Sequence, residues 1–168
     1  MTNPNIIPCL AAALDYLARG WSVVPLCPPD HDNVGPAHEE RCESPGKAPI
    51  VSWTDYQRRR ATERELRVYW NRCPKANVGV ILGKVSSLIG IDVDGHVGET
   101  LLRDLFPGVL PTMEFTTPGG GRRLLYDMPH DWTIPTKAFK LADGELKILG
   151  EGSLTVMPPS THQNGGTY

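Results

Sequence analysis

The stretch Ile89-Gly90-Ile91-Asp92-Val93-Asp94-Gly95 says most about the fold. It joins a short β-branched run, typical of a buried strand, to two carboxylates spaced two residues apart. Side chains alternate between the two faces of a strand, so Asp92 and Asp94 should project from one face while Ile91 and Val93 enter the core. Two such carboxylates can share divalent cations, and their hard oxygens suit Mg²⁺ or Mn²⁺. Taken alone, the pattern also fits a polar strand end that runs into a turn.

Apolar patterns predict helices and strands on both sides of this stretch. Residues Pro8 to Arg19 have helical spacing with Gly20 placed to end the helix, and Thr62 to Glu65 has the form of a capping box. The other predicted elements are strands at Ser22–Leu26, Val78–Leu82 and Leu88–Val93, a helix from about Gly98 to Phe106, strands at Phe115–Thr117 and Arg123–Tyr126, and a last hairpin of Leu146–Leu149 with Leu154–Met157. This order predicts an α+β fold with helices on one face of a sheet.

Length and charge set limits on the class of protein. The 168 residues fit one domain, and the net charge of −2 lacks the positive excess expected of a nucleic-acid binder. Local basic stretches such as Arg58 to Arg60 fit either a binding groove or a solvated surface. No apolar run has the roughly 18 residues that a membrane span requires, and no export signal is recognisable, so a cytoplasmic protein is expected.

A glycine-rich turn supplies a second signal, Thr116-Thr117-Pro118-Gly119-Gly120-Gly121-Arg122-Arg123. Backbone amides at Gly120 and Gly121 can approach a phosphate chain closely, and the forked donors of Arg122 and Arg123 match phosphate oxygens. No Gly-Lys-Ser/Thr follows, so this is not a Walker motif. By itself it also fits an ordinary glycine-rich hairpin.

The C-terminal stretch Val156-Met157-Pro158-Pro159-Ser160-Thr161-His162 is the third signal. Two prolines fix a rigid corner, and Ser160 and His162 just beyond it can donate to phosphate or sugar. Standing alone, the stretch is a turn.

The loop from Cys27 to Pro49 holds a separate constellation, Cys27-x3-His31-x6-His38-x3-Cys42. Two Cys and two His within sixteen residues can complete a tetrahedral Zn²⁺ shell, although the spacing is looser than in common zinc fingers. The alternative is free thiols and solvent-exposed histidines.

Together and in this order, the three signals resemble the prim-pol domain of the archaeo-eukaryotic primase superfamily, found in phage and plasmid replication proteins. The resemblance runs from the first helix through Pro45-Gly46-Lys47-Ala48-Pro49 and Ala76-Asn77-Val78-Gly79 to Pro-Pro-Ser. It implies a primase-like catalytic core with a mainly antiparallel or mixed sheet packed against helices. It also implies Asp92 and Asp94 as the main Mg²⁺ or Mn²⁺ ligands. The nucleotide-binding residues that it implies are Lys47, Asn77, Gly120, Gly121, Arg122, Arg123, Ser160 and His162.

Two departures from the family pattern bear on catalysis. Arg123 stands where the family usually has His, which keeps phosphate binding but removes any proton transfer. Counting back from Pro158, Lys147 stands where the family has a third carboxylate. Glu145, two residues earlier on the same strand face, is our candidate third catalytic and metal ligand, and Glu151 is the fallback.

Three functions compete on these residues. The first is a template-directed DNA primase and polymerase that takes (d)NTPs and a DNA template-primer. The second is a catalytically weakened DNA-binding module of a replication initiator, and the third is a metal-dependent nuclease. The resemblance further implies that residues 1–168 are a single catalytic domain, the N-terminal fragment of a primase-helicase whose C-terminal helicase follows, in the host cytoplasm if phage-encoded.

Overall fold

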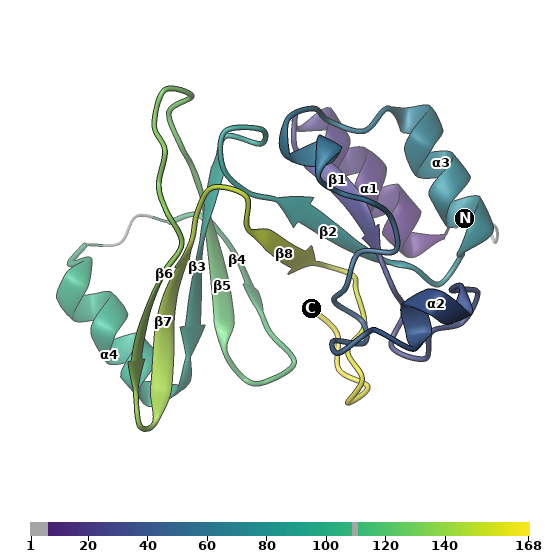
Figure 1. Cartoon of the computed structure of the whole chain (residues 1–168). Helices are drawn as coiled ribbons and strands as arrows, with labels where there is room; N and C mark the ends of the chain where they lie inside the picture. The colour runs from purple at the N-terminus through teal and green to yellow at the C-terminus, as the bar shows by residue number, and fades with distance from the viewer. Residues whose placement is uncertain (1–6, 109–110) are drawn as a thin grey trace, which may run out of the picture. The chain divides into compact units, whose positions relative to one another are not determined.

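The structure is a computed structural model that describes residues 7–108 and 111–168. The chain, drawn in Figure 1, divides into two compact units. The first unit comprises Met1–Ile81 and Val156–Tyr168, and the second comprises Leu82–Thr155.

Helices and a small antiparallel sheet make up the first unit (Figure 1). Strands β1 and β2 are buried along their whole length, as expected for short β-branched runs. Strand β8 completes the sheet in the order β1-β2-β8. The elements are α1 (Pro8–Ala18), β1 (Ser22–Leu26), α2 (Pro36–Glu39), a 3₁₀ turn η1 (Asp55–Gln57), α3 (Glu63–Arg72), β2 (Asn77–Ile81) and β8 (Leu154–Met157).

Helix α3 begins with the predicted capping box. Thr62 Oγ1 accepts from the backbone N–H of Glu65 at 3.2 Å, and the Glu65 carboxylate accepts from the N–H of Thr62 at 2.7 Å. The helix buries Leu66 and Trp70, and the Trp70 indole N–H donates to the Ala76 carbonyl at 3.0 Å. This amphipathic helix therefore has both its start and its inner face fixed by the sequence.

A five-stranded antiparallel sheet with one helix forms the second unit (Figure 1). The strand order is β4-β5-β3-β7-β6, so β3 lies in the middle. The elements are β3 (Leu88–Asp94), α4 (Gly95–Leu105), β4 (Met113–Thr116), β5 (Arg122–Asp127), β6 (Lys137–Leu141) and β7 (Gly144–Leu149).

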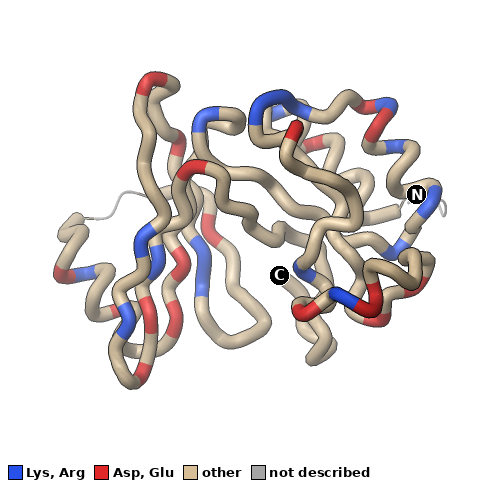
Figure 2. The backbone as a smooth tube through the Cα atoms, in the orientation of Figure 1, with Lys and Arg blue, Asp and Glu red and all other residues tan. Residues whose placement is uncertain are grey.

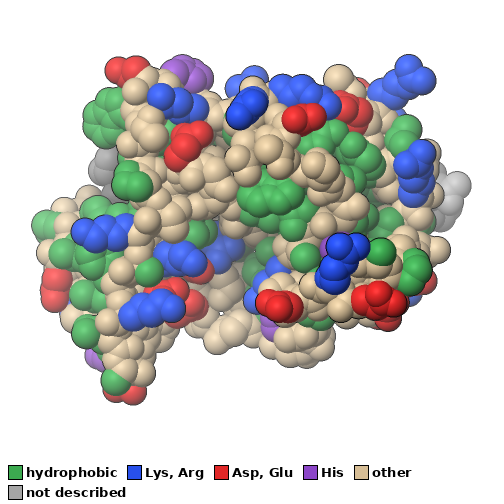
Figure 3. Space-filling view, viewed as in Figure 1, with side chains coloured by type: hydrophobic (Ala, Val, Ile, Leu, Met, Phe, Trp, Pro, Cys, Tyr) green, Lys and Arg blue, Asp and Glu red, His purple; other side chains and the backbone are tan. Residues whose placement is uncertain are grey.

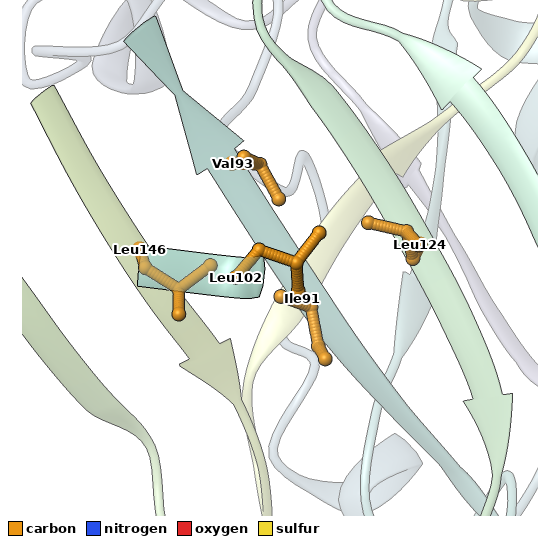
Figure 4. Packing of buried hydrophobic residues seen from close by; sticks show 5 residues of the cluster. All are labelled: Ile91, Val93, Leu102, Leu124 and Leu146. Atoms are coloured by element: carbon orange, nitrogen blue, oxygen red, sulfur yellow. The ribbon is translucent and has the colours of Figure 1, made fainter. Parts of the chain in front are cut away.

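One face of this sheet carries the core of the second unit. Ile91 and Val93 of β3 pack with Leu124 of β5, Leu146 of β7 and Leu102 of α4, and all five are buried (Figure 4). Strand alternation places every second residue of β3 on the opposite face. The apolar face packs under α4. The other face carries polar side chains around Asp92 and Asp94, and buried leucines, Leu125 and Leu149, on either side of Gly90.

The α+β class and the antiparallel sheet packed against helices are confirmed. Two details of the strand prediction were wrong. The segments at residues 146–149 and 154–157 do not pair as a hairpin, because β7 pairs with β3 and β6 while β8 belongs to the other sheet. Strand β6 was not predicted, since only Phe139 among its residues is even partly buried and no alternation marks it. In the described part of the chain, no helix is long and apolar enough to cross a membrane.

Candidate nucleotide and metal site

Strand β3 presents Asp92 and Asp94 on the sheet face opposite α4. Both side chains are partly exposed, while Ile91 and Val93 between them are buried. The exit of two carboxylates from one face therefore follows from strand geometry, as the sequence predicted. The next residue, Gly95, has φ 68° and begins α4.

The glycine-rich turn lies directly against Asp94. A side chain on Gly121 would overlap the Asp94 carboxylate and would come within 2.6 Å of the Val93 carbonyl oxygen. The turn is closed by hydrogen bonds from the Thr117 N–H to the Gly121 carbonyl (2.8 Å) and from the Gly120 N–H to the Thr117 carbonyl (2.9 Å). Only glycine at 121 allows the turn and the carboxylate to meet.

Arg123 and Asp92 form a mostly buried ion pair on this face. They are directly opposite each other in the β3–β5 register, and Arg123 Nη2 lies 2.7 Å from Asp92 Oδ2. The side chains are 10% and 16% exposed, respectively. Arg123 Nη1 also donates to Thr155 Oγ1 at 2.7 Å. Among the described residues, the buried Asp92 Oδ1 and Arg123 Nε have no hydrogen-bond partner, so each keeps one unused polar atom.

Arg122 points to the other face of the sheet, because neighbouring residues of a strand alternate. Its guanidinium donates to both carboxylate oxygens of Glu99 on α4 (2.7 and 2.8 Å) and to Glu114 on β4 (2.9 Å). These hydrogen bonds lower the pKa of Glu99 and raise the pKa of Arg122. The structure thus does not bring Arg122 to the face of Asp92 and Asp94.

Strand β7 brings one acid and one base to the acidic pair. Glu145 is opposite Asp94 in the β3–β7 register, and Lys147 is opposite Asp92. Glu145 and Lys147 therefore lie on the same sheet face as the two aspartates. Glu145 Oε2 lies 3.1 Å from Lys140 Nζ of β6. The fallback residue Glu151 is used elsewhere, since its carboxylate accepts the backbone N–H of Lys84 at 2.9 Å.

The face therefore carries mixed charge. Strand β6 carries lysines, β3 carries aspartates and β7 carries one acid and one base, so basic and acidic positions lie near one another in the tube view. Basic and acidic side chains also adjoin in the space-filling view (Figures 2 and 3). Among the described residues, one group of three or more potential metal ligands has its ligand atoms close together. That group is Cys27, His31, His38 and Cys42 of the first unit. The three carboxylates of this face thus do not converge as Cys27, His31, His38 and Cys42 do.

Asn77 and Ser160 of the first unit use their polar groups within the protein. Asn77 is 1% exposed; its amide donates to the carbonyls of Gly46 (2.9 Å) and Thr161 (2.7 Å) and accepts the Thr161 N–H at 3.0 Å. The buried Ser160 hydroxyl bonds the backbone N–H and carbonyl of Val78 at 3.0 and 3.2 Å. Both residues hold the segments around them in place.

Lys47 and His162 are the more accessible members of the predicted set in this unit. Lys47 is exposed, in a turn where its N–H donates to the Ser44 carbonyl at 3.0 Å. His162 is partly exposed and lines a cavity of about 530 Å³ together with Lys75 and Thr161. Their side chains are available to a ligand, in contrast to those of Asn77 and Ser160.

The Cys/His loop gathers its four predicted ligands. One ligand atom from each of Cys27, His31, His38 and Cys42 lies within 4.8 Å of all the others. The two thiol sulfurs are 3.8 Å apart, close to the separation of about 3.8 Å set by two 2.3 Å Zn–S bonds at a tetrahedral angle. Both His Nε2 atoms are buried without a hydrogen-bond partner in the described structure. The donor set and its geometry fit zinc.

Two residues of the acidic face were missed by sequence reasoning. Thr155 supports Arg123, and Lys140 pairs with Glu145. Their roles depend on which strands are neighbours, and no sequence pattern gave the place of β6 or β8. A correct pairing of β6 with β7 would have pointed to Lys140, because Lys140 is opposite Glu145.

These features define an α+β protein with a sheet face that carries both acidic and basic side chains. The chain belongs to the Prim-Pol family, "Bifunctional DNA primase/polymerase, N-terminal", which it matches over residues 13–168. Membership assigns it at a general level to DNA primase and polymerase activity, with DNA and nucleotides as substrates and divalent metal ions as cofactors. A comparison with curated proteins finds no match.

Proposed function

We propose that the chain extends a primer on a DNA template, by attack of a 3′-hydroxyl on the α-phosphate of a (d)NTP with release of pyrophosphate. One observation carries this proposal: Asp92 and Asp94 leave one face of β3 with the glycine-rich turn against Asp94 and Arg123 on Asp92. A carboxylate pair next to phosphate-binding donors is what nucleotidyl transfer needs.

In this proposal Asp92 and Asp94 are the main ligands of Mg²⁺ or Mn²⁺, and Glu145 is the third. The unpartnered Asp92 Oδ1 supports the fit, because a buried carboxylate oxygen without a partner is costly unless it gains a ligand. The bound cations would neutralise phosphate charge and make the attacking hydroxyl more acidic. Glu145 must leave Lys140, and because the Lys140 side chain is 75% exposed, breaking this pair costs little.

Arg123 and Lys147 provide positive charge beside the acids. Arg123 holds Asp92 in place through Nη2, and its fork can turn to a phosphate when Asp92 takes a cation. Lys147 sits opposite Asp92 on the same face. Gly120 and Gly121 let the backbone of the turn approach the triphosphate.

Lys47 and His162 of the first unit are proposed contacts to nucleotide phosphate or sugar, since both are accessible. Asn77 and Ser160 are proposed to act through the segments that they hold. Arg122 is not part of this proposed site, because its guanidinium is bound to Glu99 and Glu114.

We further propose that residues 1–168 act as one catalytic domain at the front of a phage or plasmid primase-helicase that works in the cytoplasm, which is the host's if the protein is phage-encoded. The family description as an N-terminal domain supports a following domain. The Cys/His cluster is proposed to bind one structural Zn²⁺, supported by its sulfur–sulfur distance and its two unpartnered imidazole nitrogens.

Primer extension with Mg²⁺ or Mn²⁺ tests the main proposal. The Asp92→Ala, Asp94→Ala protein should lose extension by at least about 100-fold, because the charge of the transition state is no longer compensated, yet it should keep most of its DNA binding. Asp104→Asn is the matched control, an exposed acid on α4 that should change nothing. Extension that survives the double change refutes the metal assignment.

A second function, a catalytically weakened DNA-binding module of a replication initiator, is favoured by one observation. Asp92 already has a guanidinium partner, and its other strand neighbour is Lys147 instead of an acid. Both features oppose tight cation binding at Asp92. Template-primer binding by the wild type with no extension in either metal would establish this function over the first.

A further inference from the structure

The Cys27–Pro49 loop consists of two halves that are held to the protein in different ways. The first half is tied down by its own contacts. Lys75 pairs with Asp30 (3.2 Å) and Asp32 (3.0 Å), and the Cys73 thiol lies 3.3 Å from the Asp32 carbonyl. Cys27 and His31 belong to this anchored half.

The second half begins with α2, which buries no residue. Among the described residues, its side-chain contacts are local, such as Arg41 Nε to the Ala37 carbonyl at 2.9 Å, apart from the approaches of Cys42 to Cys27 and of the His38 ring to the His31 ring. His38 and Cys42 belong to this half. A metal ion in the cluster would therefore take two ligands from the anchored half and two from the loosely held half.

Cys42 leads directly into the segment Ser44–Pro49, which carries Lys47. This segment runs back to the end of β1, where the Cys27 N–H donates to the Ala48 carbonyl at 2.8 Å and the Cys27 thiol approaches the Ser44 carbonyl at 3.9 Å. We call residues Ser44 to Ala48 the Lys47 turn. Cys27 thus contacts Cys42 of the Cys/His cluster and both ends of the Lys47 turn.

Gly46 fixes the other side of the Lys47 turn. It has φ 82°, and an added side chain would meet the Thr161 carbonyl at 3.3 Å and the Asn77 amide at 3.5 Å. The Asn77 amide of β2 donates to the carbonyls of both Gly46 and Thr161. These hydrogen bonds hold the turn to β2 and to the residues after Pro159. Cys42 precedes Ser44 by two residues, so the position of Cys42 limits where this turn can begin.

Two residues of the loop have a left-handed backbone conformation. His31 and Asn33 have φ of 53° and 59°, a left-handed conformation that costs free energy for residues other than glycine. Zinc ligation would offset this cost, since structural zinc contributes directly to folding.

We propose that Zn²⁺ bound by Cys27, His31, His38 and Cys42 joins the two halves of the loop and thereby orders the Lys47 turn, so that phosphate binding by Lys47 depends on zinc. The ordering stands on the loop geometry alone, and the phosphate step rests on the proposed function. The two parts can fail separately.

Hydrogen exchange tests the ordering without any nucleotide. The wild type should contain about one zinc per chain, and the amides of Lys47 and Ala48 should be protected. Cys42→Ser should lose the zinc and exchange these amides at least about tenfold faster, while the β1–β2 ladder at Val23 and Val80 stays protected. Trypsin cleavage after Arg41 and Lys47 should rise in parallel.

Two variants serve as controls. Cys9→Ser removes a thiol of α1 outside the cluster and should change neither zinc nor exchange. Cys42→His keeps a zinc ligand and should restore protection at Lys47 and Ala48. If Cys42→Ser unfolds completely, chelator-treated wild type decides instead, because protection that does not return with added Zn²⁺ refutes the proposal. A wild type without zinc, or zinc loss with unchanged protection, also refutes it.

A fluorescent deoxynucleoside triphosphate with Mg²⁺ tests the second part. Zinc removal should weaken its binding as much as Lys47→Ala does, and Lys47→Ala should retain its zinc. If zinc removal frees the segment and nucleotide affinity stays constant, the ordering is supported and the role of Lys47 in the proposed site is refuted.

Discussion

The chain has two groups of candidate metal ligands, and they differ in how the protein treats them. In the Cys/His loop, the four ligand atoms converge and the imidazole Nε2 atoms have no partner in the described structure. On the β3 face, Asp92 is paired with Arg123 and Glu145 with Lys140. In the first group, the two buried imidazole nitrogens would gain a partner from a bound ion. In the second group, Arg123 and Lys140 already offset the charges of Asp92 and Glu145.

This difference indicates two kinds of metal dependence. A converging set of unpaired ligands makes the ion part of the fold, because the ion binds the folded chain only. Carboxylates that already have basic partners allow the sheet to fold without an ion, and a cation that arrives with a triphosphate then competes with those partners. The structural ion and the catalytic ion are thus expected to respond to different experiments.

The largest expected effect is on stability, and it should separate the two ions. Adding Zn²⁺ to chelated protein at about 1,000 times its Kd should raise the free energy of unfolding by about 4 kcal/mol. Millimolar Mg²⁺ should raise it by less than about 1 kcal/mol, because its ligands are already paired. Urea unfolding with each metal measures both values. Equal stabilisation by the two ions would contradict the comparison.

A smaller effect is expected from the Asp92–Arg123 pair. Arg123→Met leaves a mostly buried carboxylate unpaired and should cost about 3 kcal/mol of unfolding free energy. Arg122→Met, in the adjacent residue with a more exposed ion pair, should cost about 1 kcal/mol. Adding Asp92→Leu to Arg123→Met should recover much of the loss. Equal costs for the two arginine changes would show that Asp92 does not depend on Arg123.

The smallest effect concerns the capping box of α3, which lies outside both groups of candidate metal ligands and so gives a baseline. Hydrogen bonds from Arg59, and then from Thr62, lower the pKa of Glu65 to about 2. A lowered carboxyl pKa stabilises the folded protein fully at a pH above the ordinary pKa of 4.5. This stabilisation is lost as the pH falls towards 2. Glu65→Gln should therefore cost about 1 kcal/mol at pH 7 and almost nothing near pH 2. A cost independent of pH would assign it to packing.

The sequence predicted those features of the fold that depend on local pattern. The capping box at Thr62, the short strands and the alternation of Asp92 with Ile91 are all local, and the structure contains them. The pairing of β7 with β3 and the existence of β6 were missed, because strand neighbours are set by long-range packing.

The candidate site shows the same limit. Alternation alone could have separated Arg122 from Arg123, since neighbouring strand residues face opposite ways, but their shared charge suggested a common role. The internal use of Asn77 and Ser160 was beyond local reasoning, because their partners lie 82 to 84 residues away in the chain. Cys27 to Cys42 was predictable as a set because its members are close in sequence.

The two unlike faces of β3 restrict how its length can change during evolution. Deleting one residue at Gly90 would shift the register by one, turn the carboxylates towards Leu102 and push Ile91 into the tight space of Gly90, against Leu82 and Leu149. Only paired insertions or deletions preserve the orientation of the strand. Natural length variation in relatives should therefore gather in the preceding turn at Lys84 to Ser87, where the chain can absorb it.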